Sequence, residues 1–201
     1  MAVQRLFRFR AADALLPAAL AAVMILVHVL AASKAGTLRY EREGVLSGEA
    51  WRLVTGHLVH ADGTHLAWNV LGVVLVGFLF ARVYPAWQWL VILAVSVAAV
   101  DAGFLLFEPQ LEWYVGFSGA LHGLMAAGLV AWLRTARDPV TWLVAALFAA
   151  KLAWEHFAGA LPFTAQSLSL PVVHEAHTYG AVGGLLAGLW LARRAPPPAS
   201  L

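Results

Sequence analysis

Two residues that are far apart in the sequence have side chains suited to acyl transfer. Ser118 lies in the Gly-Phe-Ser-Gly segment 116–119, and His177 lies in the Ala-His-Thr-Tyr-Gly segment 176–180. A serine hydroxyl is a weak nucleophile until a neighbouring base removes its proton, and neutral imidazole is the usual base. We therefore predict that Ser118 is the nucleophile and His177 its base.

Acyl transfer also requires hydrogen-bond donors for the oxyanion of the tetrahedral intermediate. The candidates are the backbone N–H groups at the start of the helix that begins near Ser118, together with the side chains of Asn69 and His65. Gly116 and Gly119 flank the nucleophile, where the lack of a side chain lets backbone and substrate approach closely.

The composition indicates a membrane protein. Of the 201 residues, 62% are hydrophobic, and the mean hydropathy is +0.77, whereas soluble domains are roughly 45–50% apolar. The chain has no cysteine, which excludes disulfides, thiolate metal ligands and a cysteine nucleophile. The pI near 9.3 does not indicate nucleic-acid binding, because the arginines punctuate apolar segments instead of forming a patch.

The apolar segments predict an all-α integral membrane protein with six transmembrane helices, since about 20 residues cross the hydrocarbon layer. We place these helices at 14–32, 65–83, 87–107, 115–133, 140–158 and 173–192. A long connection over 33–64 contains Trp51 and Leu53 beside Arg52, which is typical of a segment at the membrane interface. We expect one membrane domain over residues 1–194 and a disordered tail over 195–201.

The arginines predict the orientation of the chain. Eight of them fall on one side of the six predicted helices: Arg5, Arg8, Arg10, Arg82, Arg134, Arg137, Arg193 and Arg194. The positive-inside tendency makes this side cytoplasmic, so we expect both termini in the cytoplasm. The start of the chain resembles a secretory signal, but its apolar run is too long and lacks a convincing cleavage site, so we expect the first helix to be retained.

This topology brings the polar residues together. The second, fourth and sixth helices begin at the outer surface, and near their beginnings lie His65 and Asn69, then Ser118, then Glu175 and His177. Polar groups at membrane depth usually face the bundle interior or a water-filled cavity. Gly180 and Gly184 share a helix face below His177, a spacing that allows close packing. We expect the sixth helix to pack on the fourth and to bring His177 to Ser118.

These motifs resemble those of the rhomboid intramembrane serine proteases. Segment 116–119 resembles their GxSG motif, segment 176–184 resembles their AHxxGxxxG helix, and the spacing of His60, His65 and Asn69 is similar to that in their second helix. The resemblance covers almost the whole chain. It implies a six-helix fold and a serine–histidine dyad without metal or cofactor, in which the last two of these second-helix residues assist the oxyanion.

Within this family the chain resembles the rhombosortases in segments 48–60, 118–123, 151–155 and 175–180. These are bacterial rhomboids paired with exported proteins that carry a C-terminal Gly-Gly sorting tail, made of a Gly-rich motif, an apolar helix and a basic end. The resemblance implies an enzyme of the bacterial inner membrane that cleaves such membrane-anchored substrates at its periplasmic side, by hydrolysis or by transfer to a second nucleophile. The alternative is a general rhomboid protease acting on other single-span proteins.

One residue departs from the pattern of many bacterial rhomboids. They carry an aromatic residue four positions after the serine, stacked behind the catalytic histidine, whereas this chain has His122. His122 lies one helical turn from Ser118 on the same face, where it either supports His177 or competes with it as the base.

The other polar residues of the predicted helices leave several interpretations open. Lys151 and Glu155 form an intrahelical pair, a substrate gate or a structural lock. Asp101 has no partner that the sequence identifies. Glu175 either orients His177 or polarises the rim of the site, and we assign no third catalytic member.

Three further histidines are expected to have structural roles. His57 and His60 would form hydrogen bonds at the interface, and His28 would contact a neighbouring helix.

Two other classes of function compete with the serine protease. His174 and His177 flank a Glu-Ala pair, which suggests an intramembrane zinc protease, but the usual zinc helix spaces its histidines four residues apart instead of three. A transporter or haem-binding bundle would show broken helices or facing histidines at mid-membrane depth, whereas the polar residues here cluster near the outer surface. The sequence therefore favours a serine protease.

Overall fold

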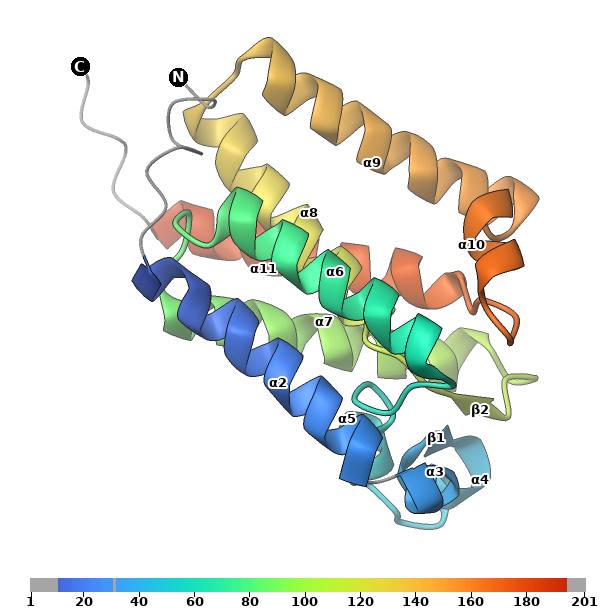
Figure 1. Ribbon diagram of the computed structural model, residues 1–201. Helices are drawn as coiled ribbons and strands as arrows, with labels where there is room; N and C mark the ends of the chain where they lie inside the picture. Colours follow the sequence, from blue (N-terminus) through green and yellow to red (C-terminus); the bar gives the residue numbers. More distant parts are fainter. Residues whose placement is uncertain (1–10, 31, 195–201) are drawn as a thin grey trace.

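The computed structural model describes residues 11–30 and 32–194, and this part of the chain contains six long helices (Figure 1). They are α2 (Leu15–Leu30), α6 (Gly63–Phe80), α7 (Ala86–Phe107), α8 (Ser118–Thr135), α9 (Pro139–Ala158) and α11 (Glu175–Arg194). Each coincides within a few residues with one of the six segments predicted from the apolar pattern. The predicted tail over 195–201, with Arg5, Arg8 and Arg10, falls outside the described residues.

Short elements connect the long helices. They are η1 (Ala11–Ala14), η2 (Ala32–Lys34), α3 (Ala35–Leu38), β1 (Tyr40–Glu41), α4 (Arg42–Leu46), α5 (Arg52–Thr55), β2 (Trp113–Tyr114) and α10 (Pro162–Ser167). Strands β1 and β2 form an antiparallel pair in which Tyr40 lies opposite Tyr114. This pair joins the connection after α2 to the segment that leads into α8.

Aspartate caps determine where α6 and α9 begin. Asp62 accepts a hydrogen bond from the N–H of His65 at 2.8 Å, and Asp138 accepts one from the N–H of Thr141 at 3.0 Å. Such a cap satisfies an N–H group that has no partner within its helix. Pro139 follows its cap directly, and its fixed φ angle suits the first turn of a helix.

Three helices of the described residues are long and apolar enough to cross a membrane, namely Ala12–Leu30, Gly63–Phe80 and Ala86–Phe107. Their outward faces carry exposed leucines such as Leu26, Leu71 and Leu90. Many exposed apolar side chains on such helices indicate contact with a membrane or a partner. Together with the length of the helices, they identify the chain as a membrane protein.

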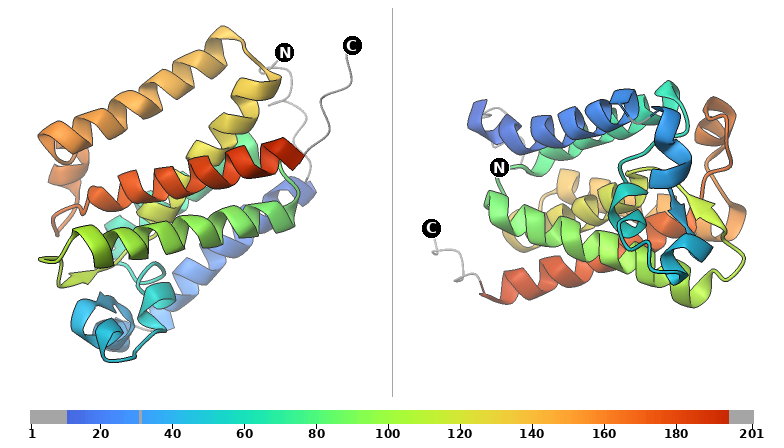
Figure 2. Two further views of the ribbon diagram at one scale, coloured as in Figure 1. Left: turned by 180° about the vertical axis from the view of Figure 1, so that it is seen from behind. Right: turned by 90° about the horizontal axis from the view of Figure 1, so that it is seen from below.

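Helix α8 lies at the centre of the bundle, in contact with α6, α7, α9 and α11. Helix α2 packs on α6 along one side of the molecule, and α9 lies on the other side (Figures 1 and 2). Buried side chains of Phe80, Ile92 and Ala127 join α6, α7 and α8 in the main core. The first residue of α8 is therefore held by a helix that is packed on several sides.

Glycines allow α11 to lie directly against α8. A Cβ atom at Gly180 would overlap the backbone of Gly119, and one at Gly184 would overlap the backbone of Gly123. This contact confirms the predicted close packing of the sixth helix on the fourth.

The connection between α2 and α6 gathers at one end of the bundle (Figure 2). Arg52 is buried at 6% exposure and donates hydrogen bonds to the carbonyls of Gly36 and Arg39 at 2.9 Å, while the neighbouring Trp51 is exposed. Arg42 donates to the carbonyl of Phe104 at 2.9 Å, near the end of α7. These arginines fix the connection to itself and to the bundle.

Candidate active site

Ser118 and His177 meet at the beginnings of two helices. Ser118 is the first residue of α8, and His177 lies in the first turn of α11. The hydroxyl of Ser118 is 3.0 Å from Nε2 of His177, and the imidazole is almost completely buried. This is the geometry that a nucleophile and its general base require.

The other ring nitrogen of His177 contacts Glu155, a residue that the sequence did not connect with His177. Glu155 lies in the last turn of α9, and its Oε2 accepts a hydrogen bond from Nδ1 of His177 at 2.9 Å. The same oxygen is 2.6 Å from Nζ of Lys151, so the expected intrahelical pair is present as well. The predicted topology offered one indication of this contact, because the end of α9 and the start of α11 lie at the same end of the bundle (Figure 1).

Glu175, which sequence reasoning considered as a partner of His177, lies elsewhere. Its carboxylate is 3.5 Å from Nε2 of His174, and its side chain is partly exposed. The carboxylate that contacts His177 therefore comes from another helix and not from the neighbouring residue.

His122 lies behind His177, with ring centroids 4.0 Å apart and an interplanar angle of 15°. Its Nδ1 is 2.7 Å from the carbonyl oxygen of Ser118. Because a carbonyl oxygen only accepts, Nδ1 carries the proton and Nε2 accepts a hydrogen bond from Lys151, 2.8 Å away. Both ring nitrogens are thus engaged with groups other than the Ser118 hydroxyl, an arrangement that favours support of His177 over competition with it.

A cavity of about 460 Å³ lies beside Ser118. Its lining includes His65, Asn69, Ser118, His122, Lys151, Glu155 and His177. Asn69 is buried, and its Nδ2 donates one hydrogen bond to the carbonyl of His65 at 3.0 Å. Because an amide nitrogen carries two hydrogens, this bond leaves one that can serve an oxyanion.

Gly116 fixes the loop that leads into α8. Its φ of +122° is rarely adopted by other residues, and it ends the preceding segment so that α8 begins at Ser118 instead of at the predicted residue 115. Its carbonyl accepts a hydrogen bond from the hydroxyl of Tyr114 at 2.7 Å, and its N–H donates to the carbonyl of Gly56 at 3.1 Å. The group that approaches Gly116 closely is the ring of His65, since a Cβ atom here would lie 2.6 Å from it.

Gly119 was expected to let backbone and substrate approach closely, and the backbone that approaches it is that of α11, whereas the described lining of the cavity does not include Gly119. A Cβ atom at this position would lie 2.9 Å from the carbonyl oxygen of Ala176 in α11. Successive residues of a helix are rotated by about 100° from one another, so Gly119 points to α11 when Ser118 points to the cavity. Its role is helix packing.

Asp101, which had no partner in the sequence, lies 3.2 Å from Nε2 of His57. The ring of His57 packs edge-on against Tyr114, with 5.5 Å between centroids. Since Tyr114 holds Gly116, this buried pair supports the loop before the nucleophile from behind.

His60 and His28 also contact other histidines. Nδ1 of His60 donates to the carbonyl of Leu58 at 3.1 Å, and its ring lies edge-on to those of His65 and His28. Burial lowers the pKa of His60 to about 3, so that it is neutral at physiological pH. These contacts agree with the structural roles expected for His57 and His60, whereas His28, expected to contact a neighbouring helix, contacts His60 in the connection before α6.

Three side chains of the site could be considered as metal ligands. His122, Glu155 and His177 each place one donor atom within 4.8 Å of the others. The ammonium group of Lys151, however, lies 2.8 Å from Nε2 of His122 and 2.6 Å from Oε2 of Glu155, where it would repel a metal cation. The donor set therefore fits proton transfer better than metal binding, and His174 of the alternative zinc pattern contacts Glu175 instead.

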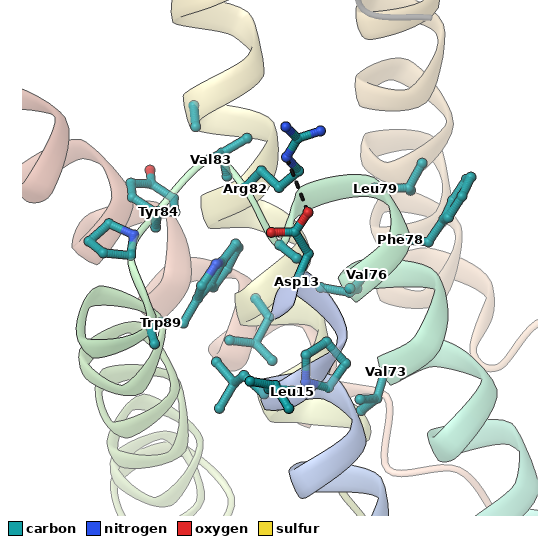
Figure 3. A pocket seen from close by; sticks show the side chains of 18 of the residues that line it. Asp13, Leu15, Val73, Val76, Phe78, Leu79, Arg82, Val83, Tyr84 and Trp89 are labelled. Carbon is teal, nitrogen blue, oxygen red and sulfur yellow. Dashed lines mark ion pairs between the residues drawn. The ribbon is translucent and has the colours of Figure 1, made fainter. Parts of the chain in front are cut away.

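A larger cavity, of about 880 Å³, lies at the opposite end of α6, between α2, α7 and α8 (Figure 3). An ion pair of Asp13 with Arg82, 3.3 Å apart, lies at its edge beside Tyr84 and Trp89. Its lining among the described residues contains neither serine nor histidine. The smaller cavity is therefore the candidate active site.

Comparison with known proteins shows the family of the chain. The Rhomboid domain family matches residues 47–194. The "Putative rhomboid protease YdcA" of Bacillus subtilis (strain 168) is 36% identical over a region that covers 43% of this chain and 43% of that protein. The rhomboid protease AarA of Providencia stuartii is 29% identical over 42% of this chain and 35% of that protein. The rhomboid protease GluP of Bacillus subtilis (strain 168) is 35% identical over 43% of this chain and 17% of that protein. The matched regions thus span less than half the length of each of these relatives.

The family match covers most of the chain and includes α6, α8 and α11, the helices that carry Asn69, Ser118 and His177. On this evidence the chain belongs to the rhomboid family.

Proposed function

We propose that this chain is an intramembrane serine endopeptidase in which Ser118 is the nucleophile and His177 its base. The observation that carries the proposal is the 3.0 Å contact between the hydroxyl of Ser118 and Nε2 of His177 beside a cavity. Membership of the rhomboid family supports it, because the related proteins named above are described as rhomboid proteases.

The geometry suggests the following reaction. Oγ of Ser118 attacks the scissile carbonyl carbon while Nε2 of His177 takes the hydroxyl proton. The N–H groups of the first turn of α8 and the amide of Asn69, with His65 beside it, stabilise the oxyanion. His177 then gives the proton to the leaving amine as the C–N bond breaks, and it later activates the water that releases the acyl group.

We further propose that six helices cross the bacterial inner membrane, with both termini cytoplasmic and the cavity toward the periplasm. Helices α8, α9 and α11 have 18, 20 and 20 residues, long enough to cross with the three more apolar helices. Since the chain has no cysteine, single variants Glu112→Cys and Arg137→Cys report the orientation. A membrane-impermeant maleimide should label only Glu112→Cys in intact spheroplasts, and the reverse pattern would refute this topology.

For the substrate, we propose membrane-anchored proteins with C-terminal Gly-Gly sorting tails, as in rhombosortases. Support comes from segments 48–60, 118–123, 151–155 and 175–180, which resemble that subgroup. Cleavage of other single-span proteins, as by a general rhomboid protease, is the alternative. Incubation of the purified chain with one substrate of each kind, followed by mass spectrometry of the products, separates them: cleavage of the ordinary single-span substrate alone would refute the sorting-tail proposal.

The catalytic assignment has its own test. Ser118→Ala and His177→Ala should each abolish cleavage while the protein keeps its helical circular dichroism in detergent. Full activity of Ser118→Ala would refute the proposed mechanism.

A further inference from the structure

Glu155 lies where a carboxylate can select the tautomer of His177. Its Oε2 is 2.9 Å from Nδ1 of His177, and Nε2 of the same ring is 3.0 Å from the hydroxyl of Ser118. An ionised carboxylate only accepts hydrogen bonds, so the ring proton must be on Nδ1. Nε2 is then left with the lone pair that the proton of Ser118 requires.

Glu155 is itself held in place by a charged neighbour. The residue is only 1% exposed, and an unpaired carboxylate at such a site would be costly. Nζ of Lys151 lies 2.6 Å from Oε2 and also 2.8 Å from Nε2 of His122. The ammonium is therefore fixed between two acceptors and keeps the carboxylate paired.

The stacked ring of His122 limits movement of His177 from another direction. With 4.0 Å between the ring centroids, His122 covers one face of the imidazole. The stacking thus fixes the plane of the His177 ring. Glu155 determines the direction in which Nδ1 points within that plane and which ring nitrogen carries the proton.

We propose that Glu155 is a positioning residue of the active site, which holds His177 as the Nδ1–H tautomer and stabilises the imidazolium formed when Ser118 attacks. The proposal extends the dyad of the proposed function to Ser118, His177 and Glu155, and it rests on that function. Where a serine protease carries aspartate in this place, its change to asparagine lowers kcat about 10⁴-fold, because the wrong tautomer forms.

The test uses the full chain in detergent and a fluorophosphonate probe, which reacts with an activated serine without need of a known substrate. Glu155→Gln keeps the size of the side chain, but its amide can donate to Nδ1 and favour the wrong tautomer. We expect the second-order rate constant for labelling of Ser118 to fall by about 10²–10⁴-fold. Glu175→Gln is the matched control, because this glutamate lies near His177 in the sequence but contacts His174. The Glu175→Gln variant should be labelled at the wild-type rate.

A second measurement reads the tautomer in the wild-type protein, and a variant is needed only to assign the resonances. In wild-type protein labelled with ¹⁵N-histidine, the resonances of His177, assigned by their loss in His177→Ala, should show the proton on Nδ1. A proton on Nε2 would overturn the proposal, as would labelling of Glu155→Gln within about threefold of the wild type when Ser118→Ala is unlabelled. Labelling that persists in Ser118→Ala would instead refute the proposed function itself.

Discussion

The contact between α11 and α8 at Gly180 sets the distance from His177 to Ser118, so Gly180→Ala should impair catalysis. The added Cβ atom would overlap the carbonyl group of Gly119, a backbone group that cannot rotate away. The new Cβ atom would lie 1.9 Å from the carbonyl oxygen, whereas carbon atoms in contact are about 3.5–4.0 Å apart, so relief of the overlap requires the two helices to separate by more than about 1 Å. The present 3.0 Å contact between Ser118 and His177 would then exceed hydrogen-bond length.

A displacement of about 1 Å at a catalytic pair costs about 10²-fold in rate, and overpacking of a core costs about 1–3 kcal/mol in stability. Both quantities can be measured on Gly180→Ala, by the rate of fluorophosphonate labelling and by thermal unfolding in detergent. The matched control is Gly188→Ala, where the new Cβ atom would lie 3.1 Å from its nearest neighbour, Cα of Ala127, about two turns further along α11. Gly188→Ala should react much faster than Gly180→Ala, and a wild-type rate and melting temperature for Gly180→Ala would refute the argument.

Three other changes test separate parts of the site. Asn69→Ala should lower kcat by about 10²–10³-fold with little change in KM, as expected for loss of an oxyanion donor; steady-state kinetics check this, and a change confined to KM would contradict it. Asp62→Ala should lower the free energy of unfolding by about 0.5–2 kcal/mol at pH 7, because it removes the N-cap of α6. Hydrogen bonds from Ser169 and from the N–H of His65 hold the pKa of Asp62 below its usual range. The wild type should therefore lose its stability advantage over Asp62→Ala as the pH falls below about 4. Thermal unfolding of both proteins from pH 7 to pH 3 checks this. Chelators such as phenanthroline should leave cleavage unchanged, because the ammonium group of Lys151 would repel a metal cation between His122 and Glu155; activity lost to the chelator and restored by zinc would refute this.

The positions of the long helices were predictable because length and apolar composition alone decide which segments suit a membrane. The meeting of Ser118 and His177 was also predictable, since Gly180 and Gly184 let α11 and α8 approach closely. Both features depend on residues within one helix or on one helix face, which a sequence displays directly.

The contact of Glu155 with His177 was not predictable in the same way. It depends on how α9 is rotated and tilted relative to α11, and α9 makes few contacts that the sequence pattern reveals. The burial of Arg52 likewise depends on backbone carbonyls of Gly36 and Arg39, whose directions follow from the path of the connection and not from residue types. The sequence places Gly119 beside the nucleophile, but the side of α8 on which it lies depends on how this helix is rotated about its axis.

The hydrogen bonds around His177 form a closed ring that starts and ends on one residue. From the carbonyl of Ser118 it passes through His122, Lys151, Glu155 and His177, and it returns to the hydroxyl of Ser118. A ring of this kind has no end at which one member can be replaced without leaving its neighbours short of a partner. We therefore expect His122, Lys151 and Glu155 to be inherited together, so that relatives with an aromatic hydrocarbon side chain at the position of His122 lack the lysine and the glutamate as well; an alignment in which the three vary independently would contradict this.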